Sequence, residues 1–263
     1  MTHQTLEFCT TQLDGHILTV TINRPEVMNS LHPPANFELE QVFNTFAEDP
    51  EQWVAILTGA GDRAFSAGND LKYLASGGKS GTPSTGFAGL TARFNCSKPI
   101  IAAVNGVAMG GGFEIALACD LIIAADTAKF ALPEPRVGLA ALAGGLHRLP
   151  RQIGLKQAMG MILTGRHVPA QEGKELGFVN AVVPQTDLMA EARRWAEMIL
   201  ECSPLSIRTS KESVMHGLDQ SNLENAIRHE RDLTCVKDLF NSADFIEGPK
   251  AFAEKRKPQW QGK

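Results

Sequence analysis

One stretch near the middle of the chain, Pro99 to Glu114, constrains the fold more than any other. An apolar strand, Pro99 to Val104, leads through a short turn to three consecutive glycines, Gly110 to Gly112, and a helix follows them. Glycines let a backbone take positive φ angles and approach a ligand closely. The first amides of the following helix have no partner within it, and the helix dipole favours negative charge there. This turn therefore either holds a developing oxyanion or merely packs the helix against the strand.

Strands alternate with helices over the first two thirds of the chain, and helices dominate from Arg151 onward. That order predicts an α/β core of mostly parallel strands followed by a helical layer. The expected strands are Leu6–Phe8, Ile17–Ile22, Val54–Thr58, Pro99–Val104 and Leu121–Ala125. The expected helices are Pro33–Glu48, Glu114–Cys119, Arg151–Leu163, Ala170–Glu175, Asp187–Glu201, Pro204–His216 and Asn222–Phe240. The glycine- and serine-rich stretch Ser76–Gly89 is expected to be a mobile surface loop.

The same glycines allow a second interpretation, a dinucleotide-binding unit. Such a unit also begins with a strand, a glycine turn and a helix, and Asp126 follows Gly106 by 20 residues, where a ribose-binding acid would lie. The glycines, however, are spaced G-x-x-x-G-G-G rather than G-x-G-x-x-G. The helix that follows them ends before Asp120, which makes it too short for that unit. The pattern therefore disfavours dinucleotide binding.

Two further stretches place polar groups where a site could lie. Ser66 lacks the first glycine of the G-x-S-x-G pattern, because position 64 is alanine, so a turn residue is favoured over a nucleophile. Glu134 stands between two prolines, which predicts a rigid, non-helical segment. Taken alone, Glu134 is expected to be a solvated loop acid and Glu114 a surface acid. Their spacing does not show whether the two carboxylates meet.

Composition and charge narrow the functional classes. An apolar fraction of 43% is ordinary for a globular protein, and a net charge of −4 disfavours nucleic acid and anionic membranes as partners. Five cysteines without a CxxC pair suit reduced thiols in the cytoplasm. No secretory pattern is visible at the N-terminus, and the longest apolar run, Ile100–Val104, is too short to span a bilayer. These features together predict a cytoplasmic protein. No histidines are spaced as metal ligands, so we expect no metal site.

Seven short motifs follow one another along nearly the whole chain. They are Asn23-Arg24-Pro25 with Asn29-Ser30-Leu31, Phe65–Leu71, Ala103–Gly106 with Gly110–Gly112, Phe130 to Gly138 around Pro133-Glu134, Gly144-Gly145 with Arg148-Leu149, Leu163–Gly165, and Ala251–Arg256. In this order they resemble the enoyl-CoA hydratase/isomerase (crotonase) family. The resemblance implies a core of repeated ββα units, residues 1–200, and a C-terminal helical region, residues 201–263, that takes part in trimer formation. Two such trimers usually stack into a hexamer.

The resemblance also implies roles for particular residues. The backbone N–H groups of Asn69 and Gly111 would form an oxyanion hole, and Glu114 and Glu134 would hold the attacking water during reversible hydration of a 2-enoyl-CoA thioester. Coenzyme A is part of that substrate, so no separate cofactor is implied. The residues expected to bind coenzyme A are Arg24, Asp70, Leu71, Lys72 and, from a neighbouring subunit, Phe252 and Lys255.

The sequence departs from many hydratases at the acyl end of the pocket. Ala141-Leu142 replaces a common Pro-Gly pair and Leu146 a common threonine, so the acyl specificity stays open. Residues 86–91 and 247–260 resemble the carnitinyl-CoA dehydratase branch, and an isomerase that needs one carboxylate is a further alternative. A non-catalytic RNA-binding relative is a remote one, because the expected helix Pro33–Glu48 contains acids but no lysine or arginine.

Overall fold

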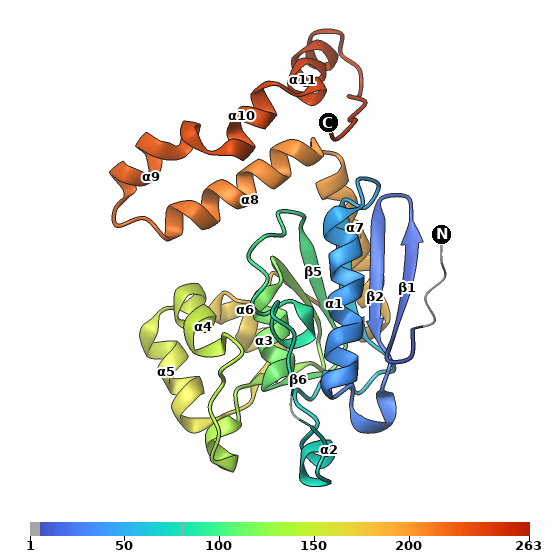
Figure 1. The fold of residues 1–263 in the computed structure, drawn as a ribbon, viewed down its shortest axis with the longest axis vertical. Helices are drawn as coiled ribbons and strands as arrows, with labels where there is room; N and C mark the ends of the chain where they lie inside the picture. Colours follow the sequence, from blue (N-terminus) through green and yellow to red (C-terminus); the bar gives the residue numbers. More distant parts are fainter. Residues whose placement is uncertain (1–5, 80) are drawn as a thin grey trace.

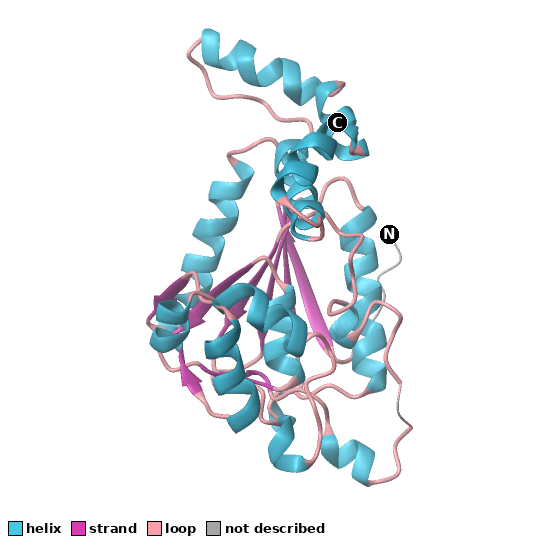
Figure 2. Cartoon of the chain, turned by 90° about the vertical axis from the view of Figure 1, so that its left-hand side faces the viewer, coloured by secondary structure: helices cyan, strands magenta, loops and turns pink. Residues whose placement is uncertain are grey.

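Two β-sheets, surrounded by helices, organise the computed structural model, which describes residues 6–79 and 81–263 (Figures 1 and 2). The larger sheet has the order Cys9–Asp14 (β1), Ile17–Ile22 (β2), Val54–Gly59 (β3), Ile100–Val104 (β5), Leu121–Ala125 (β7) and Ala181–Val183 (β10). The smaller sheet has the order Ala64–Ser66 (β4), Val107–Met109 (β6), Lys129–Ala131 (β8) and Val168–Pro169 (β9). Apart from the antiparallel pairs β1–β2 and β8–β9, the paired strands run parallel.

The helices connect and cover these strands. The α-helices are Pro33–Glu48 (α1), Leu71–Ala75 (α2), Gly111–Ala118 (α3), Gly145–Ile153 (α4), Leu155–Thr164 (α5), Ala170–Leu176 (α6), Leu188–Leu200 (α7), Pro204–Leu218 (α8), Leu223–His229 (α9), Thr234–Phe240 (α10) and Ala243–Ala253 (α11). Five short 3-10 helices complete the described part of the chain: Pro25–Val27 (η1), Phe87–Gly89 (η2), Glu134–Val137 (η3), Gln185–Asp187 (η4) and Glu230–Asp232 (η5).

A repeated strand–strand–helix unit builds the core. A strand of the larger sheet leads to a strand of the smaller sheet and then to a helix, in the series β3–β4–α2, β5–β6–α3 and β7–β8–η3. The expected ββα core is confirmed. Because β4 pairs with β6 and β6 with β8 in parallel, the segments that follow these three strands emerge side by side. Three distant parts of the sequence thus meet at one edge of the smaller sheet.

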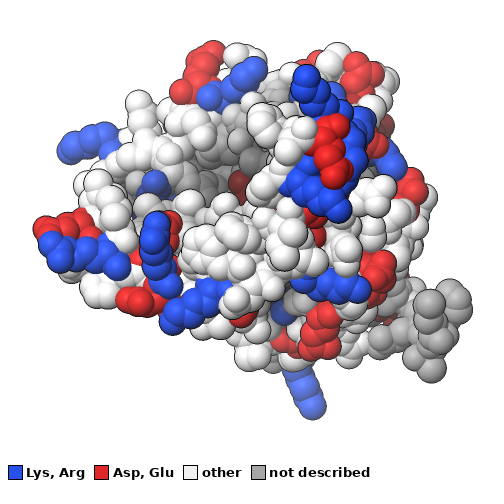
Figure 3. All heavy atoms as spheres, turned by 90° about the horizontal axis from the view of Figure 1, so that it is seen from above, with Lys and Arg blue, Asp and Glu red and all other residues white. Residues whose placement is uncertain are grey.

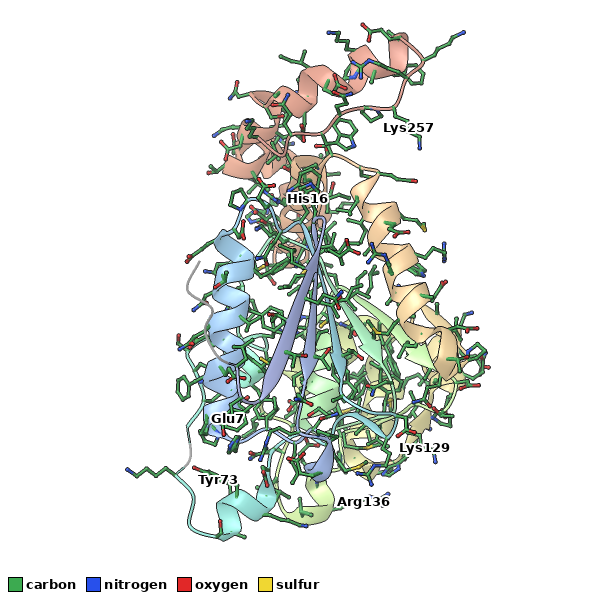
Figure 4. The ribbon with its side chains drawn as sticks, turned by 90° about the vertical axis from the view of Figure 1, so that its right-hand side faces the viewer. Glu7, His16, Tyr73, Lys129, Arg136 and Lys257 are labelled. Atoms are coloured by element: carbon green, nitrogen blue, oxygen red, sulfur yellow. The ribbon has the colours of Figure 1, made fainter. Side chains whose placement is uncertain are left out.

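Helices cover both faces of the larger sheet. Strands β3 and β5 are buried along their whole length, as expected for parallel strands covered on both sides. Helix α1 buries Leu39, Phe43 and Phe46, and α7 packs against β3, β5 and β7. Figure 4 shows these two helices, in blue and orange, on opposite sides of the strands. The expected bounds of α1 are correct, since Pro33 suits the first turn of a helix and Pro50 follows its end.

Several expected elements are wrong in bounds. Residues Leu6–Phe8 are not a strand, because the Glu38 carboxylate binds the backbone N–H groups of Glu7, Phe8 and Cys9 at 2.7, 2.7 and 2.8 Å, and β1 begins only at Cys9. The single helix expected over Arg151–Leu163 is two, α4 and α5. They are separated by Gly154, whose φ of +84° and ψ of 152° interrupt the helical backbone.

Other differences lie in loops and at the C-terminal end. The expected helix Asn222–Phe240 is divided into α9, η5 and α10, and α11 was not expected. The expected surface loop Ser76–Gly89, of which Ser80 lies outside the described residues, ends in the buried η2. There the Ala88 N–H donates to the Asn36 side chain at 2.7 Å. Glu134 begins η3 and is therefore not in a non-helical segment.

Helices α8 to α11 form an arm beyond one end of the sheets (Figure 1). Its tail folds back, since Trp260 Nε1 donates to the Glu201 carbonyl at 2.9 Å and the Gln261 N–H to Asp244 at 2.8 Å. In Figure 4, Tyr73 of α2 and Arg136 of η3 lie at one end of the molecule and Lys257 at the other. Viewed from the arm, acidic and basic side chains are interspersed (Figure 3). No helix within the described ranges is long and apolar enough to cross a membrane.

Candidate active site

The amides of Asn69 and Gly111 come together where β4 and β6 end. Gly68 has a φ of +87°, and a Cβ added to it would lie 2.8 Å from the Gly111 nitrogen, so the two backbones are in contact. Gly111 is the first residue of α3, where amides have no partner in the helix. Neither the Asn69 nor the Gly111 N–H donates a hydrogen bond to any described residue. Two free amide donors therefore lie at adjacent positions.

An N-terminal turn holds the segment before Asn69. The Leu31 N–H donates to the Gly68 carbonyl at 2.8 Å, and the Leu31 carbonyl accepts from the Asp70 N–H at 3.0 Å. These two bonds fix the peptides on both sides of Asn69 while leaving its own N–H unpaired. The orientation of this donor is thus set by residues nearly 40 positions earlier.

The Ser66 hydroxyl is part of the same support. It donates to the Asn29 carbonyl at 2.8 Å and accepts from the Gly68 N–H at 3.1 Å. Ser66 is fully buried and ends β4. Its hydroxyl is engaged in structural hydrogen bonds and is too buried to act as a nucleophile. The residue lies in a strand and not in the turn that the sequence predicted.

Glu114 lies in the first turn of α3 and is buried, with 3% of its surface exposed, so the expectation of a surface acid is wrong. The Gly145 N–H donates to its Oε1 at 2.8 Å. Burial raises the pKa of the Glu114 carboxyl to about 7, and the Glu134 carboxylate acts in the same direction, whereas the Gly145 amide and the Arg148 guanidinium oppose the shift. A carboxyl with such a pKa can give and take protons near neutral pH.

Glu134 begins η3, directly after the smaller sheet. A Cβ added to Gly110 would lie 3.0 Å from its Oε1, so this carboxylate sits against the glycine turn that leads into α3. Burial also raises the pKa of Glu134. Its Oε2 is buried and has no hydrogen-bond partner within the part of the chain that the structure describes. The expectation of a solvated loop acid is therefore wrong.

The structure thus brings four of the expected residues together. Glu114 and Gly111 are on one turn of α3, and Glu134 lies against Gly110, which precedes that helix. Asn69 follows Gly68, whose backbone contacts Gly111. Three phenylalanines, one from α3, fix the helix against β8 with ring centroids 5.1–5.2 Å apart: Phe113, Phe130 and Phe178. Two carboxyls with raised pKa values thus lie close to a pair of unpaired amides.

Arg24 and Asp70 form an ion pair of 3.1 Å in which both side chains are mostly buried. Asp70 also caps α2 by accepting from the Tyr73 N–H at 3.1 Å. Burial opposes ionisation of Asp70, but the Tyr73 amide and the Arg24 guanidinium outweigh it and lower the pKa. These two residues therefore anchor α2, whereas Leu71 at the start of that helix is exposed.

The remaining expected residues are divided between two ends of the molecule. Lys72 is exposed on α2, beside the site, whereas Phe252 and Lys255 are exposed at the end of α11 on the arm. Figure 1 shows α2 and α11 at opposite ends. Phe252 and Lys255 are thus not brought to the Glu114 site of their own chain.

Sequence reasoning missed the groups that hold Glu114. The Gly144–Gly145 turn and Arg148 were noticed only as motif residues, yet Gly145 supplies the hydrogen bond to Glu114 and Arg148 lies within electrostatic reach of it. The available signal was the pair of adjacent glycines, which permits close backbone approach. Across residues 6–79 and 81–263, no cluster of three or more histidine, cysteine or acidic side chains could hold a metal ion. All five cysteines are free thiols.

Two sheets wound in strand–strand–helix units, with a site at the edge of the smaller sheet, match proteins of the crotonase fold. An enoyl-CoA hydratase from Mycobacterium tuberculosis superposes with a TM-score of 0.91 at 36% identity, covering 97% of this chain and 99% of that one. A carnitinyl-CoA hydratase from Mycobacterium avium gives 0.78 at 37% identity, covering 98% and 100%. The carnitinyl-CoA dehydratase of Escherichia coli K12 is 44% identical over 254 residues, 95% of this chain and 97% of that protein.

A sequence model of the enoyl-CoA hydratase/isomerase family matches residues 12–263. The chain therefore belongs to that family. It is a lyase of the hydratase/dehydratase type. The resemblance expected from the seven motifs is confirmed.

Proposed function

We propose that this protein adds water reversibly to the double bond of a 2-enoyl-CoA thioester and forms a 3-hydroxyacyl-CoA. The observation that carries the proposal is the pairing of the buried Glu114 carboxyl and the half-buried Glu134 carboxyl with two free amides beside them. Hydration of a conjugated thioester needs an acceptor for the proton of water, a donor to C2 and stabilisation of negative charge on the thioester oxygen. This site can supply all three.

In the proposed reaction, the Asn69 and Gly111 N–H groups bind the thioester oxygen. Glu114 accepts a proton from water as the water oxygen bonds to C3, and negative charge moves to the thioester oxygen. The C2–C3 double bond is lost in this step; Glu134 then delivers a proton to C2, and the thioester carbonyl reforms. Loss of one such amide donor costs about 3 kcal/mol, and each proton transfer contributes roughly 10²–10⁴-fold. The two carboxyls titrate as a coupled pair.

The coenzyme A part of the substrate is proposed to lie along α2, against Leu71 and Lys72, with the Arg24–Asp70 pair holding that helix. Phe252 is on α11 and Lys255 follows that helix, at the opposite end of the molecule from α2 (Figure 1). We propose that they reach the nucleotide of a neighbouring subunit in a trimer, or in a hexamer of two trimers. Exposed apolar side chains along the arm support such assembly: Val214, Leu218, Leu223, Ile227, Ile246 and Phe252. Five free thiols are consistent with the cytoplasm.

Turnover of 2-butenoyl-CoA tests the proposal. The wild-type protein should remove the conjugated thioester absorbance, and both Glu114→Gln and Glu134→Gln should lose most of this activity. Glu175→Gln, an exposed acid on α6, is the matched control and should behave as wild type. Folded protein without turnover of 2-enoyl-CoA thioesters of several chain lengths would refute hydration. Activity that survives one of the two site substitutions would instead indicate a double-bond isomerase.

A second candidate is dehydration of carnitinyl-CoA, and the 44% identity to carnitinyl-CoA dehydratases over 95% of the chain favours it. The same acids and amides would act in the opposite direction on a 3-hydroxyacyl group that carries a trimethylammonium. The acyl end of the site differs from that of many hydratases at Ala141, Leu142 and Leu146. Comparison of kcat/KM for carnitinyl-CoA and 3-hydroxybutyryl-CoA decides between the two candidates.

A further inference from the structure

The side chain of Arg148, on α4, packs against the Gly144–Gly145 turn at the start of that helix. Its Nη1 donates to the Thr91 carbonyl at 2.9 Å. A Cβ added to Gly144 would overlap the same Nη1, and the Arg148 Cζ lies 5.9 Å from the centroid of the Phe94 ring. The guanidinium therefore occupies the space that a side chain at position 144 would need.

The turn above Arg148 holds the Glu114 carboxylate. Gly144 has a φ of +103°, and its carbonyl accepts from the Arg148 N–H at 2.8 Å. The next residue, Gly145, donates its N–H to Glu114 Oε1 at 2.8 Å. The contacts that hold Gly144 in place therefore also hold the Gly145 N–H, which donates to Glu114.

Thr91 links the same support to the amide donors. Its Oγ1 accepts from the Phe87 N–H at 2.8 Å. The Phe87 ring lies so close to Gly111 that a Cβ there would be 2.6 Å from the ring. A connected set of contacts therefore runs from Gly111 through Thr91 to Arg148 and on to Glu114.

The positive charge of Arg148 also acts on the ionisation of Glu114. The charged side chains that act on Glu114 are Glu134 from η3, which opposes its ionisation, and Arg148 from α4, which favours it. Arg148 itself faces Glu114 and the Cys119 thiol, and burial lowers its pKa while those two groups oppose the shift. A cation at this place counteracts the burial of the Glu114 carboxylate.

We propose that Arg148 is a positioning residue: its guanidinium braces the Gly144–Gly145 turn against Thr91 and thereby orients the Glu114 carboxylate toward the attacking water. The positive charge also keeps a larger share of Glu114 ionised. The inference rests on the proposed function only in taking Glu114 as the base that receives a proton from water.

The test compares Arg148→Met, which removes the charge, with Arg148→Lys, which retains it. Arg151→Met is the matched control, because Arg151 is exposed on the same helix and donates to the His147 carbonyl of its own helix. Steady-state hydration of 2-butenoyl-CoA is measured between pH 5 and 9. In Arg148→Met we expect kcat to fall about 10–100-fold with KM within about threefold. We also expect the acid limb of the profile to move up by about one pH unit.

Arg148→Lys should keep the wild-type acid limb and lose less kcat, while Arg151→Met should match wild type. A folded Arg148→Met with wild-type kcat and limb overturns the inference. If Arg148→Met does not fold, Arg148→Lys decides. A lower kcat with an unmoved limb supports the inference, whereas a shifted limb or an unchanged kcat overturns it.

A second measurement separates this inference from the proposed function, because it needs no substrate. The difference in Tm between each protein and its Glu114→Gln derivative is followed with pH, and its midpoint reports the ionisation of Glu114. Between the wild-type and the Arg148→Met pairs, the pKa of Glu114 in the folded chain should rise by about one unit. The midpoint lies halfway between the unfolded and the folded pKa, so it should rise by about half a pH unit. Equal midpoints overturn the role of the charge, and a wild type that does not hydrate 2-enoyl-CoA overturns the proposed function alone.

Discussion

The substitution Glu114→Gln should make the protein more stable and nearly inactive at the same time. Glu114 is 3% exposed, and burial raises its pKa from 4.5 to about 7 in the folded chain. A carboxyl whose folded pKa lies above its unfolded pKa is harder to ionise in the fold. Below pH 4.5 it is protonated in both states and has no effect on stability, whereas above pH 7 ionisation destabilises the fold in full.

The size of the effect follows from the difference of 7 − 4.5 = 2.5 pKa units, which corresponds to about 3 kcal/mol. Glutamine can still accept the Gly145 N–H, now through its carbonyl oxygen. Its NH₂ group, however, replaces the second carboxylate oxygen as an acceptor, which costs about 1 kcal/mol. We therefore expect a net gain of about 2 kcal/mol at pH 8.5 and no gain at pH 4.5.

The assay is thermal unfolding of wild type and Glu114→Gln at pH 4.5 and 8.5, at one fixed protein concentration because subunit association also stabilises. For a chain of this size, about 2 kcal/mol corresponds to a rise in Tm of roughly 4–8 °C at pH 8.5. Hydratase activity should fall by at least about 10²-fold. Equal Tm values for both proteins at both pH values would mean that the folded state does not disfavour ionisation of Glu114, and would contradict this prediction. Glu175→Gln should show no pH-dependent difference.

Three further substitutions test other parts of the site. Gly111→Ala places a Cβ 2.6 Å from the Phe87 ring, so the donor must shift, and kcat should fall about 10²-fold or more while Tm drops. Asp70→Asn breaks the mostly buried pair with Arg24 and should lower the free energy of unfolding by about 3 kcal/mol in urea denaturation. Lys255→Ala should leave Tm unchanged, because the residue is exposed, and raise KM several-fold for a coenzyme A thioester but not for an N-acetylcysteamine thioester, which lacks the nucleotide.

The controls for these predictions use exposed groups. Glu191→Gln removes the more exposed pair with Arg194, a change that should cost less than about 1 kcal/mol, so an equal loss in Asp70→Asn would contradict its structural role. Full activity in Gly111→Ala would mean that its N–H does not bind the thioester. An equal rise in KM for both thioesters in Lys255→Ala would exclude contact with the nucleotide.

Local signals in the sequence were sufficient for elements whose ends are set by neighbouring residues. The bounds of α1 follow from Pro33 and Pro50, and β3 is a short apolar run that ends at a glycine. Leu6–Phe8 has an equally plausible pattern, but its amides bond to Glu38, about 30 residues away. Periodicity contains no information about such a partner.

At the candidate site, too, the sequence predicted what depends on neighbouring residues and missed what depends on distant ones. Family motifs located Glu114 and Glu134, but their burial depends on how α3 and η3 pack against the smaller sheet. The amide that holds Glu114 belongs to Gly145, 31 residues further along, and no spacing rule connects the two. For that reason both acids were expected on the surface when their neighbours alone were considered.

The bonds that Leu31 makes on either side of Asn69 have a consequence for any anion that arrives there. The Gly68 carbonyl and the Asp70 N–H are already engaged, so the Gly68–Asn69 peptide, which carries the Asn69 N–H, cannot rotate to follow a passing ligand or to pair with the protein itself. Its dipole points in one direction before a ligand arrives and keeps that direction as negative charge grows. The surroundings then need not rearrange during the reaction, unlike water molecules, which must reorient around a new charge.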